Sequence, residues 1–304
     1  MIQKLALAAI LALFAAAQAG SVGPAREAAN ELIGRAGANL EWPLPPRSAR
    51  YRVADLLLTM RNDVDRRDPG ILRRSLVIEM PGYPPFTIDP GENDAYEPAV
   101  MVVENPPGAP MILFQTFSGG AHCCTSITAI VPREGRLEAV DVYRGDGAPM
   151  ERAPRDVDGD GAIDIVRHDN AFLYAFASYA ESYAPPRIVN IVDGEAVDVS
   201  ERPGFSSLFE EAMAEARQAC PDPDGYGANG ACAAYVAAAA RLGRFDEAWA
   251  QMLEGYDRTS AWGLDQGCRV AEIDGECPAG EAIRFDNYPD ALRNFLAEHG
   301  YIPH

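Results

Sequence analysis

The chain has 304 residues, 48% of them hydrophobic, and a formal net charge of −19. This length is enough for one large domain or two ordinary ones, and the apolar fraction is enough for a buried core. The acidity and the lack of a basic stripe disfavour nucleic-acid binding, because such a chain repels phosphate backbones. Lys4 is the only lysine, which excludes Schiff-base chemistry and a phosphate-loop lysine from the rest of the chain.

The first nineteen residues have the three parts of a secretory signal peptide. Lys4 supplies the positive charge, Leu5 to Ala17 form an apolar run, and Ala17-Gln18-Ala19 fits the small-residue rule for cleavage after Ala19. A helix of that run would be about 20 Å long, too short for a bilayer core of about 30 Å. We therefore expect the signal peptide of residues 1–19 to be removed on export, no transmembrane segment in the mature chain, and a periplasmic or secreted protein. The alternative is an uncleaved N-terminal anchor.

Composition divides the mature chain into three parts. Residues 20–50 predict a short helix over 24–35, followed by a proline-rich connector at Pro43, Pro45 and Pro46. Residues 51–203 hold short strand-like runs separated by turn residues, which predicts an antiparallel β-domain, either propeller-blade-like or a sandwich. Residues 204–304 predict a small helical domain. The expected fold class is therefore α+β.

The expected strands are rich in β-branched and aromatic residues. They cover residues 76–80, 100–104, 111–116, 127–131, 137–143, 163–166, 172–179 and 188–192. The expected helices cover residues 207–218, 231–242, 246–256 and 287–298. Ser207 and Glu210 form a capping-box pattern at the start of the first helix, and Gly243 suits the position after the second.

Six cysteines in an exported protein indicate disulfides first. They form three pairs that are close in sequence: Cys123 with Cys124, Cys220 with Cys232, and Cys268 with Cys277. Six cysteines allow fifteen connectivities. The spacing favours local pairs in the C-terminal third, so we expect the helical domain to be stapled by disulfides.

The segment with the most chemical content runs from Asp156 to Asp164. Carboxylates stand at its first, third, fifth and ninth positions, as Asp156, Asp158, Asp160 and Asp164. Calcium takes six to eight oxygen ligands, and this spacing can wrap several of them around one ion. Gly161 permits a sharp turn, and the carbonyl of Ala162 is expected to face the ion. Arg167 stands where an EF-hand needs glutamate, so we expect a strand-associated loop; the alternative is a solvated acidic turn without metal.

This acidic loop, together with Phe172, Tyr174 and Phe176, resembles the calcium repeats of FG-GAP and VCBS-type proteins of bacterial envelopes. The resemblance covers residues 100–200. It implies a β-propeller blade whose loop binds calcium structurally through the four aspartates. The Ser118-to-Cys124 segment also looks like exported bacterial proteins that carry this repeat. The chain departs from the family because it has a single acidic loop and no internal period for several blades.

His122, Cys123 and Cys124 follow two glycines and allow three interpretations. The first is a vicinal disulfide, or a bridge from one of the cysteines to elsewhere. The second is a zinc or copper site, although further ligands at suitable spacing are lacking. The third is a cysteine nucleophile activated by His122. Residues that are neighbours in sequence rarely have the geometry of such a catalytic pair.

These features favour an exported, calcium-stabilised binding or structural protein without catalytic activity, whose partner is an unknown protein or envelope component. The rival hypothesis is an exported enzyme. It would use the His122-Cys123-Cys124 segment for thiol redox or metal chemistry, or the acidic cluster for hydrolysis. A third hypothesis is a partner-binding inhibitor or assembly factor that uses residues 204–304 as its contact surface.

Overall fold

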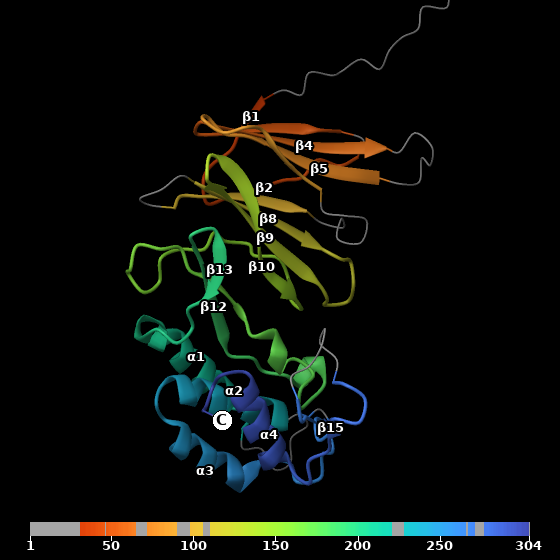
Figure 1. Ribbon diagram of the computed structural model, residues 1–304, viewed down its shortest axis with the longest axis vertical. Helices are drawn as coiled ribbons and strands as arrows, with labels where there is room; N and C mark the ends of the chain where they lie inside the picture. The colour runs from red at the N-terminus through yellow and green to blue at the C-terminus, as the bar shows by residue number, and fades with distance from the viewer. Residues whose placement is uncertain are drawn as a thin grey trace, which may run out of the picture.

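The computed structural model describes residues 31–45, 47–64, 72–89, 98–105, 110–220, 228–265, 267–270 and 277–303. The expected signal peptide, its cleavage site and the first part of the helix expected over 24–35 lie outside these residues. Within them, no helix is long and apolar enough to cross a membrane. The β-sheets lie at one end of the molecule and the helices at the other (Figure 1), so the predicted α+β fold class is confirmed.

Three sheets form the N-terminal part, and their described strand pairs are antiparallel except for β1 with β3. Sheet 1 consists, in spatial order, of β1 (Glu31–Ile33), β3 (Ala49–Val53), β4 (Leu56–Val64), β5 (Leu72–Glu79) and β6 (Phe86–Ile88). Sheet 2 consists of β10 (Arg136–Gly145), β9 (Thr125–Arg133), β8 (Met111–Phe117), β7 (Ala99–Val103) and β2 (Asn39–Leu40). Sheet 3 consists of β11 (Ile165–His168), β12 (Pro186–Val192) and β13 (Glu195–Asp198).

Sheet 2 is covered on both faces. Phe114 of β8 belongs to a core shared with Leu58 and other residues of sheet 1, so sheets 1 and 2 form a sandwich. Leu113, on the opposite face of the same strand, belongs to a second core with Ile165 of sheet 3. Burial on both faces explains why β8 is a continuous apolar run rather than an alternating one.

Two of the predicted secondary-structure elements are wrong. Glu31–Ile33, the described end of the helix expected over 24–35, forms β1, because it pairs in parallel with β3 and Arg52 holds Glu31 at 2.5 Å. Residues 172–179, expected as a strand, instead run from the end of one short 3-10 helix, η1 (Asn170–Phe172), to the start of another, η2 (Tyr179–Glu181). Their apolar residues are explained by packing into the core of the helical part, where Phe172 and Phe176 are buried.

The C-terminal part is small, helical and joined by disulfides. It contains η3 (Pro203–Phe205), α1 (Ser206–Arg217), α2 (Ala228–Arg241), α3 (Phe245–Gly255), α4 (Tyr288–Glu298) and a two-stranded ribbon of β14 (Gly267–Cys268) and β15 (Ala282–Ile283). Cys220 bonds to Cys232, which joins the end of α1 to α2, and Cys268 bonds to Cys277. The abundant alanines of α2 let it lie buried along nearly its whole length.

The two expectations for helix ends had different outcomes. Gly243 has a φ of +69°, the left-handed conformation expected of a glycine that follows a helix. The capping box expected at Ser207 is wrong, because α1 begins one residue earlier and its N-cap position is Phe205, which makes no side-chain cap bond. Ser206 instead donates its hydroxyl to the carbonyl of Pro203 at 2.7 Å.

Sheet 3 also contributes to a core that it shares with the helices. Ile188 and Val199 pack in one cluster with Phe209 of α1 and Tyr235 of α2. The core of the helical part therefore extends across residue 203, where composition places the domain boundary. Sheet 3 is a middle layer between the sandwich and the helices (Figure 1).

Candidate functional site

The acidic loop of residues 156–164 lies between β10 and β11. Its base is closed by a bridge in which the N–H of Asp164 donates to the carbonyl of Arg155 at 3.1 Å. Gly159 and Gly161 have φ values of +82° and +91°. Glycine adopts this left-handed conformation without steric cost, so these two residues let the loop turn back on itself.

The aspartates of the loop accept hydrogen bonds from its own backbone. Asp156 accepts the N–H groups of Gly159 at 2.7 Å and of Gly161 at 3.0 Å. Asp158 accepts the N–H of Asp160 at 3.0 Å, and Asp160 accepts that of Ala162 at 2.7 Å. Aspartate favours such local turns for this reason, and the bonds order the acidic side chains against the loop.

Asp164 anchors the loop to sheet 3. Its side chain is buried, and its two oxygens accept the N–H of Val157 at 2.7 Å and the side-chain amide of Asn190 at 2.6 Å. Asn190 lies on β12 and is itself buried. A carboxylate in such a place needs these donors, because an unpaired buried charge is strongly unfavourable.

Three of the carboxylates converge. Asp156, Asp158 and Asp164 each offer an oxygen, and these atoms lie within 4.8 Å of one another. Burial raises the pKa of Asp158, and the charges of Asp160 and Asp164 raise it further. Carboxylates this close repel each other unless a cation or a proton intervenes. An all-oxygen donor set of this kind suits a hard divalent cation such as calcium.

The other two predicted ligands, Asp160 and the carbonyl of Ala162, have different outcomes. Asp160 points to Arg202, whose Nη1 lies 2.5 Å from its Oδ2 and 4.0 Å from an oxygen of Asp158. Arg202 is separated from the loop by about forty residues, and nothing in the sequence connects the two. The carbonyl of Ala162 stays a prediction, since only the N–H of that residue has a described contact in the loop.

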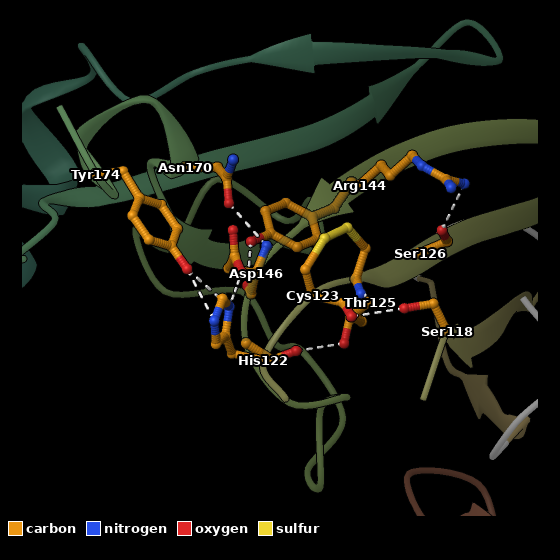
Figure 2. The surroundings of a disulfide bond; sticks show 12 residues. Ser118, His122, Cys123, Thr125, Ser126, Arg144, Asp146, Asn170 and Tyr174 are labelled. Carbon is orange, nitrogen blue, oxygen red and sulfur yellow. Dashed lines mark hydrogen bonds and ion pairs between the residues drawn. A yellow bond between two sulfur atoms is a disulfide. The ribbon is translucent and has the colours of Figure 1, made fainter. Parts of the chain in front are cut away.

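The cysteine segment lies in the loop between β8 and β9. Cys123 and Cys124 are joined to each other, with their Cα atoms 3.0 Å apart, and the described residues contain no free cysteine. Ser118 holds this segment, because its hydroxyl donates to the carbonyl of Cys123 and accepts the N–H of Cys124, both at 2.6 Å. Figure 2 shows this arrangement, which corresponds to the first of the three interpretations of the segment.

His122 has a carboxylate partner that the sequence did not reveal. Its Nδ1 lies 2.6 Å from Oδ1 of Asp146, and its Nε2 lies 2.8 Å from the hydroxyl of Tyr174 (Figure 2). Asp146 is buried, and its N–H donates to the side-chain oxygen of Asn170 at 2.7 Å. A histidine oriented by a carboxylate is an arrangement that can hold and transfer a proton.

Two tyrosines enclose the histidine. The ring of Tyr179 stacks on that of His122 at 4.1 Å, and Tyr174 lies tilted at 5.7 Å. Tyr174 has a φ of +66°, which is a strained conformation for a bulky residue. The indole N–H of Trp262 donates to the carbonyl of Tyr174 at 2.6 Å. Burial raises the pKa of Tyr174, and the charge of Asp146 adds to this. Strain of this kind is often found at functional sites.

Comparison with known proteins finds a family model that matches the C-terminal part and relatives that match a longer stretch of the chain. Residues 209–300 match the family model described as the sll0997 C-terminal domain. A relative from Synechocystis, "Probable thylakoid lumen protein sll0997", is 38% identical over 199 residues, which are 64% of this chain and 57% of the relative. "Uncharacterized protein y4bJ" from Sinorhizobium fredii is 33% identical over 215 residues, which are 70% of this chain and 33% of that protein.

The chain thus spans 57% of the length of one of these relatives and 33% of the other. No solved structure matches it. The class that fold and comparison define together is a β-sheet protein with a C-terminal helical region similar to the sll0997 C-terminal domain.

Proposed function

We propose that the chain is an exported binding or structural protein of the FG-GAP and VCBS-like kind, whose acidic loop binds calcium and is stabilised by it. The observation that carries the proposal is the convergence of the Asp156, Asp158 and Asp164 carboxylates within 4.8 Å. Calcium would neutralise their repulsion and take further oxygens from water, from Asp160 and from the Ala162 carbonyl.

The position of the loop supports a structural role for the ion. The loop contacts β12 through Asn190. It also lies against Gly204, where a Cβ atom would stand only 2.4 Å from that of Asp158. The loop thus touches sheet 3 and the residues that lead into α1, so an ion held there would strengthen the junction between the β-sheets and the helices.

Several features support an exported location. The signal-peptide pattern of residues 1–19 is one. The joined cysteine pairs are another, because disulfides persist in oxidising compartments. The similar protein from Synechocystis is named a probable thylakoid lumen protein. Extracellular and lumenal sites can work at low affinity, with Kd on the order of 10⁻⁴ to 10⁻³ M.

The test is the melting temperature of the purified mature protein in EDTA and with added calcium or magnesium. An ion that binds only the native state stabilises it by about 1.4 kcal/mol at ten times its Kd. We expect calcium to raise the melting temperature, Asp158→Asn to abolish the rise, and the control Asp193→Asn to keep it. Asp193 is exposed and has a φ of +52°, which asparagine tolerates. The same calcium shift in Asp158→Asn as in the wild type would refute the proposal.

A second candidate function is thiol–disulfide exchange at Cys123 and Cys124, which the His122–Asp146 pair favours. In this step a dithiol substrate supplies two electrons and two protons. The bond between Cys123 and Cys124 breaks to give two thiols, and the substrate becomes a disulfide. His122 is the neighbouring group able to carry a proton.

The exchange hypothesis is tested by the rate at which dithiothreitol reduces this pair at different pH values. If His122 carries the proton, Asp146→Asn changes the pH profile of that rate while Asp193→Asn leaves it unchanged. A pair that is not reduced while the protein stays folded, or identical pH profiles in the wild type and Asp146→Asn, would exclude this function.

A further inference from the structure

A pocket of about 460 Å³ lies along the edge strand β10, between strands of sheet 2 and sheet 3. None of the residues of the acidic loop lines it. One wall carries Phe114, Ser126 and Thr128 from sheet 2, and the other carries Arg167, Arg187 and Val189 from sheet 3. The pocket thus combines apolar surface, hydroxyl groups and guanidinium groups.

Three arginines from three consecutive strands reach this pocket. Arg144 comes from β10, Arg167 from β11 and Arg187 from β12. Arg167 and Arg187 are directly opposite each other in the antiparallel pair of β11 and β12. Like charges in that position destabilise a sheet. Their convergence is also unexpected in a chain whose net charge is −19.

Arg144 donates its Nη1 to the hydroxyl of Ser126 at 3.3 Å. Among these arginines, Arg167 has hydrogen-bonding capacity left unused. Arg187 donates its Nε to Asp198 at 2.9 Å. Arg167 lies over the ring of Tyr143 at 4.7 Å and donates to the carbonyl of Ala148 at 3.0 Å. The Nε of Arg167, however, is buried without a hydrogen-bond partner in the described part of the chain. A buried donor in that state is unfavourable until an acceptor reaches it.

We propose that this pocket binds a small organic anion that carries a carboxylate or phosphate on an apolar body. A guanidinium group offers paired donors that match the oxygens of either group. Ser126 and Thr128 supply hydroxyl groups beside them, and Phe114 and Val189 supply apolar contact.

Two acids also line the pocket, Asp89 and Asp141. The three arginines exceed them by a single charge, so the attraction for an anion depends on the placement of the arginines rather than on a large positive field. Removing one acid should therefore strengthen anion binding.

The test is calorimetric titration of the purified, EDTA-treated protein with inorganic phosphate, with succinate and with its neutral analogue succinamide. Low ionic strength is used because salt screens such contacts. We expect phosphate or succinate to bind saturably, which also identifies the preferred anion, and succinamide not to bind. Arg144→Gln and Arg167→Gln should each weaken binding about tenfold or more. Asp141→Asn should tighten it.

Arg136→Gln is the matched control, because Arg136 lies on the same strand and does not line the pocket. Its affinity should equal that of the wild type. Arg144 and Asp141 are exposed, so their variants keep the test valid if Arg167→Gln fails to fold. The proposal is overturned if neither anion binds, if succinamide binds equally well, or if Arg136→Gln weakens binding as much as Arg144→Gln.

Discussion

The two disulfides of the helical part should differ in their contribution to stability. Cys220 and Cys232 are 12 residues apart, and Cys268 and Cys277 are 9 apart. Loop-closure entropy alone gives each bond about 3 kcal/mol of stabilisation, with almost no difference between them. Their surroundings differ, however, because Cys220 and Cys232 are fully buried and Cys268 and Cys277 are partly exposed.

Burial adds a packing contribution to the first bond. Cys220 and Cys232 belong to the core that contains Tyr235 and Phe209. Removing each buried sulfur leaves a small void that costs about 1 kcal/mol. The double variant Cys220→Ala/Cys232→Ala should therefore lose about 5 kcal/mol, and Cys268→Ala/Cys277→Ala about 3 kcal/mol.

Urea unfolding followed by far-ultraviolet circular dichroism measures this difference. All four described α-helices lie between residues 206 and 298, so the helical signal reports on the part that these bonds join. Midpoint and slope together give the free energy of unfolding. Equal losses in the two double variants would refute the packing argument, and a larger loss for Cys268→Ala/Cys277→Ala would reverse it.

Three further substitutions test the packing at single residues. Gly230→Ala should lower the melting temperature, although alanine favours helices by about 1 kcal/mol, because the new Cβ would lie 2.8 Å from the carbonyl oxygen of Glu181. Burial raises the pKa of Tyr288 well above its ordinary value, so the folded state keeps a proton that the unfolded state releases. Wild-type stability should then fall as the pH rises above about 10, and the fall should be shallower in Tyr288→Phe. Asn62→Ala removes the acceptor at 3.0 Å from the indole of Trp42 and should cost about 1–3 kcal/mol; a red-shifted tryptophan emission with lower urea resistance checks this.

The sequence was most informative where the structure depends on local contacts. The four C-terminal helices follow from apolar periodicity and from Gly243, whose left-handed conformation is a local property. The chain reversal at Gly159 and Gly161 is also local, and it is visible in the spacing of aspartates and glycines. The same holds for the neighbouring cysteine pairs, which need little chain between them.

The sequence was least informative where distant segments meet. Asn190 and Arg202 contact the acidic loop, and Asp146 orients His122, but in each case the partner is many residues away. Their residue types are ordinary for exposed turns or strands. The true structure of residues 172–179 was hidden for a similar reason, because helices from later in the chain bury Phe172 and Phe176.

Calorimetric titration of calcium into the EDTA-treated mature protein tests the central claim most directly. We expect saturable binding of a single ion with a Kd on the order of 10⁻⁴ to 10⁻³ M. Binding should be lost in Asp158→Asn and kept in Asp193→Asn. Absence of calcium binding to the wild type, or unchanged binding to Asp158→Asn, would contradict the assignment of the acidic loop as a calcium site.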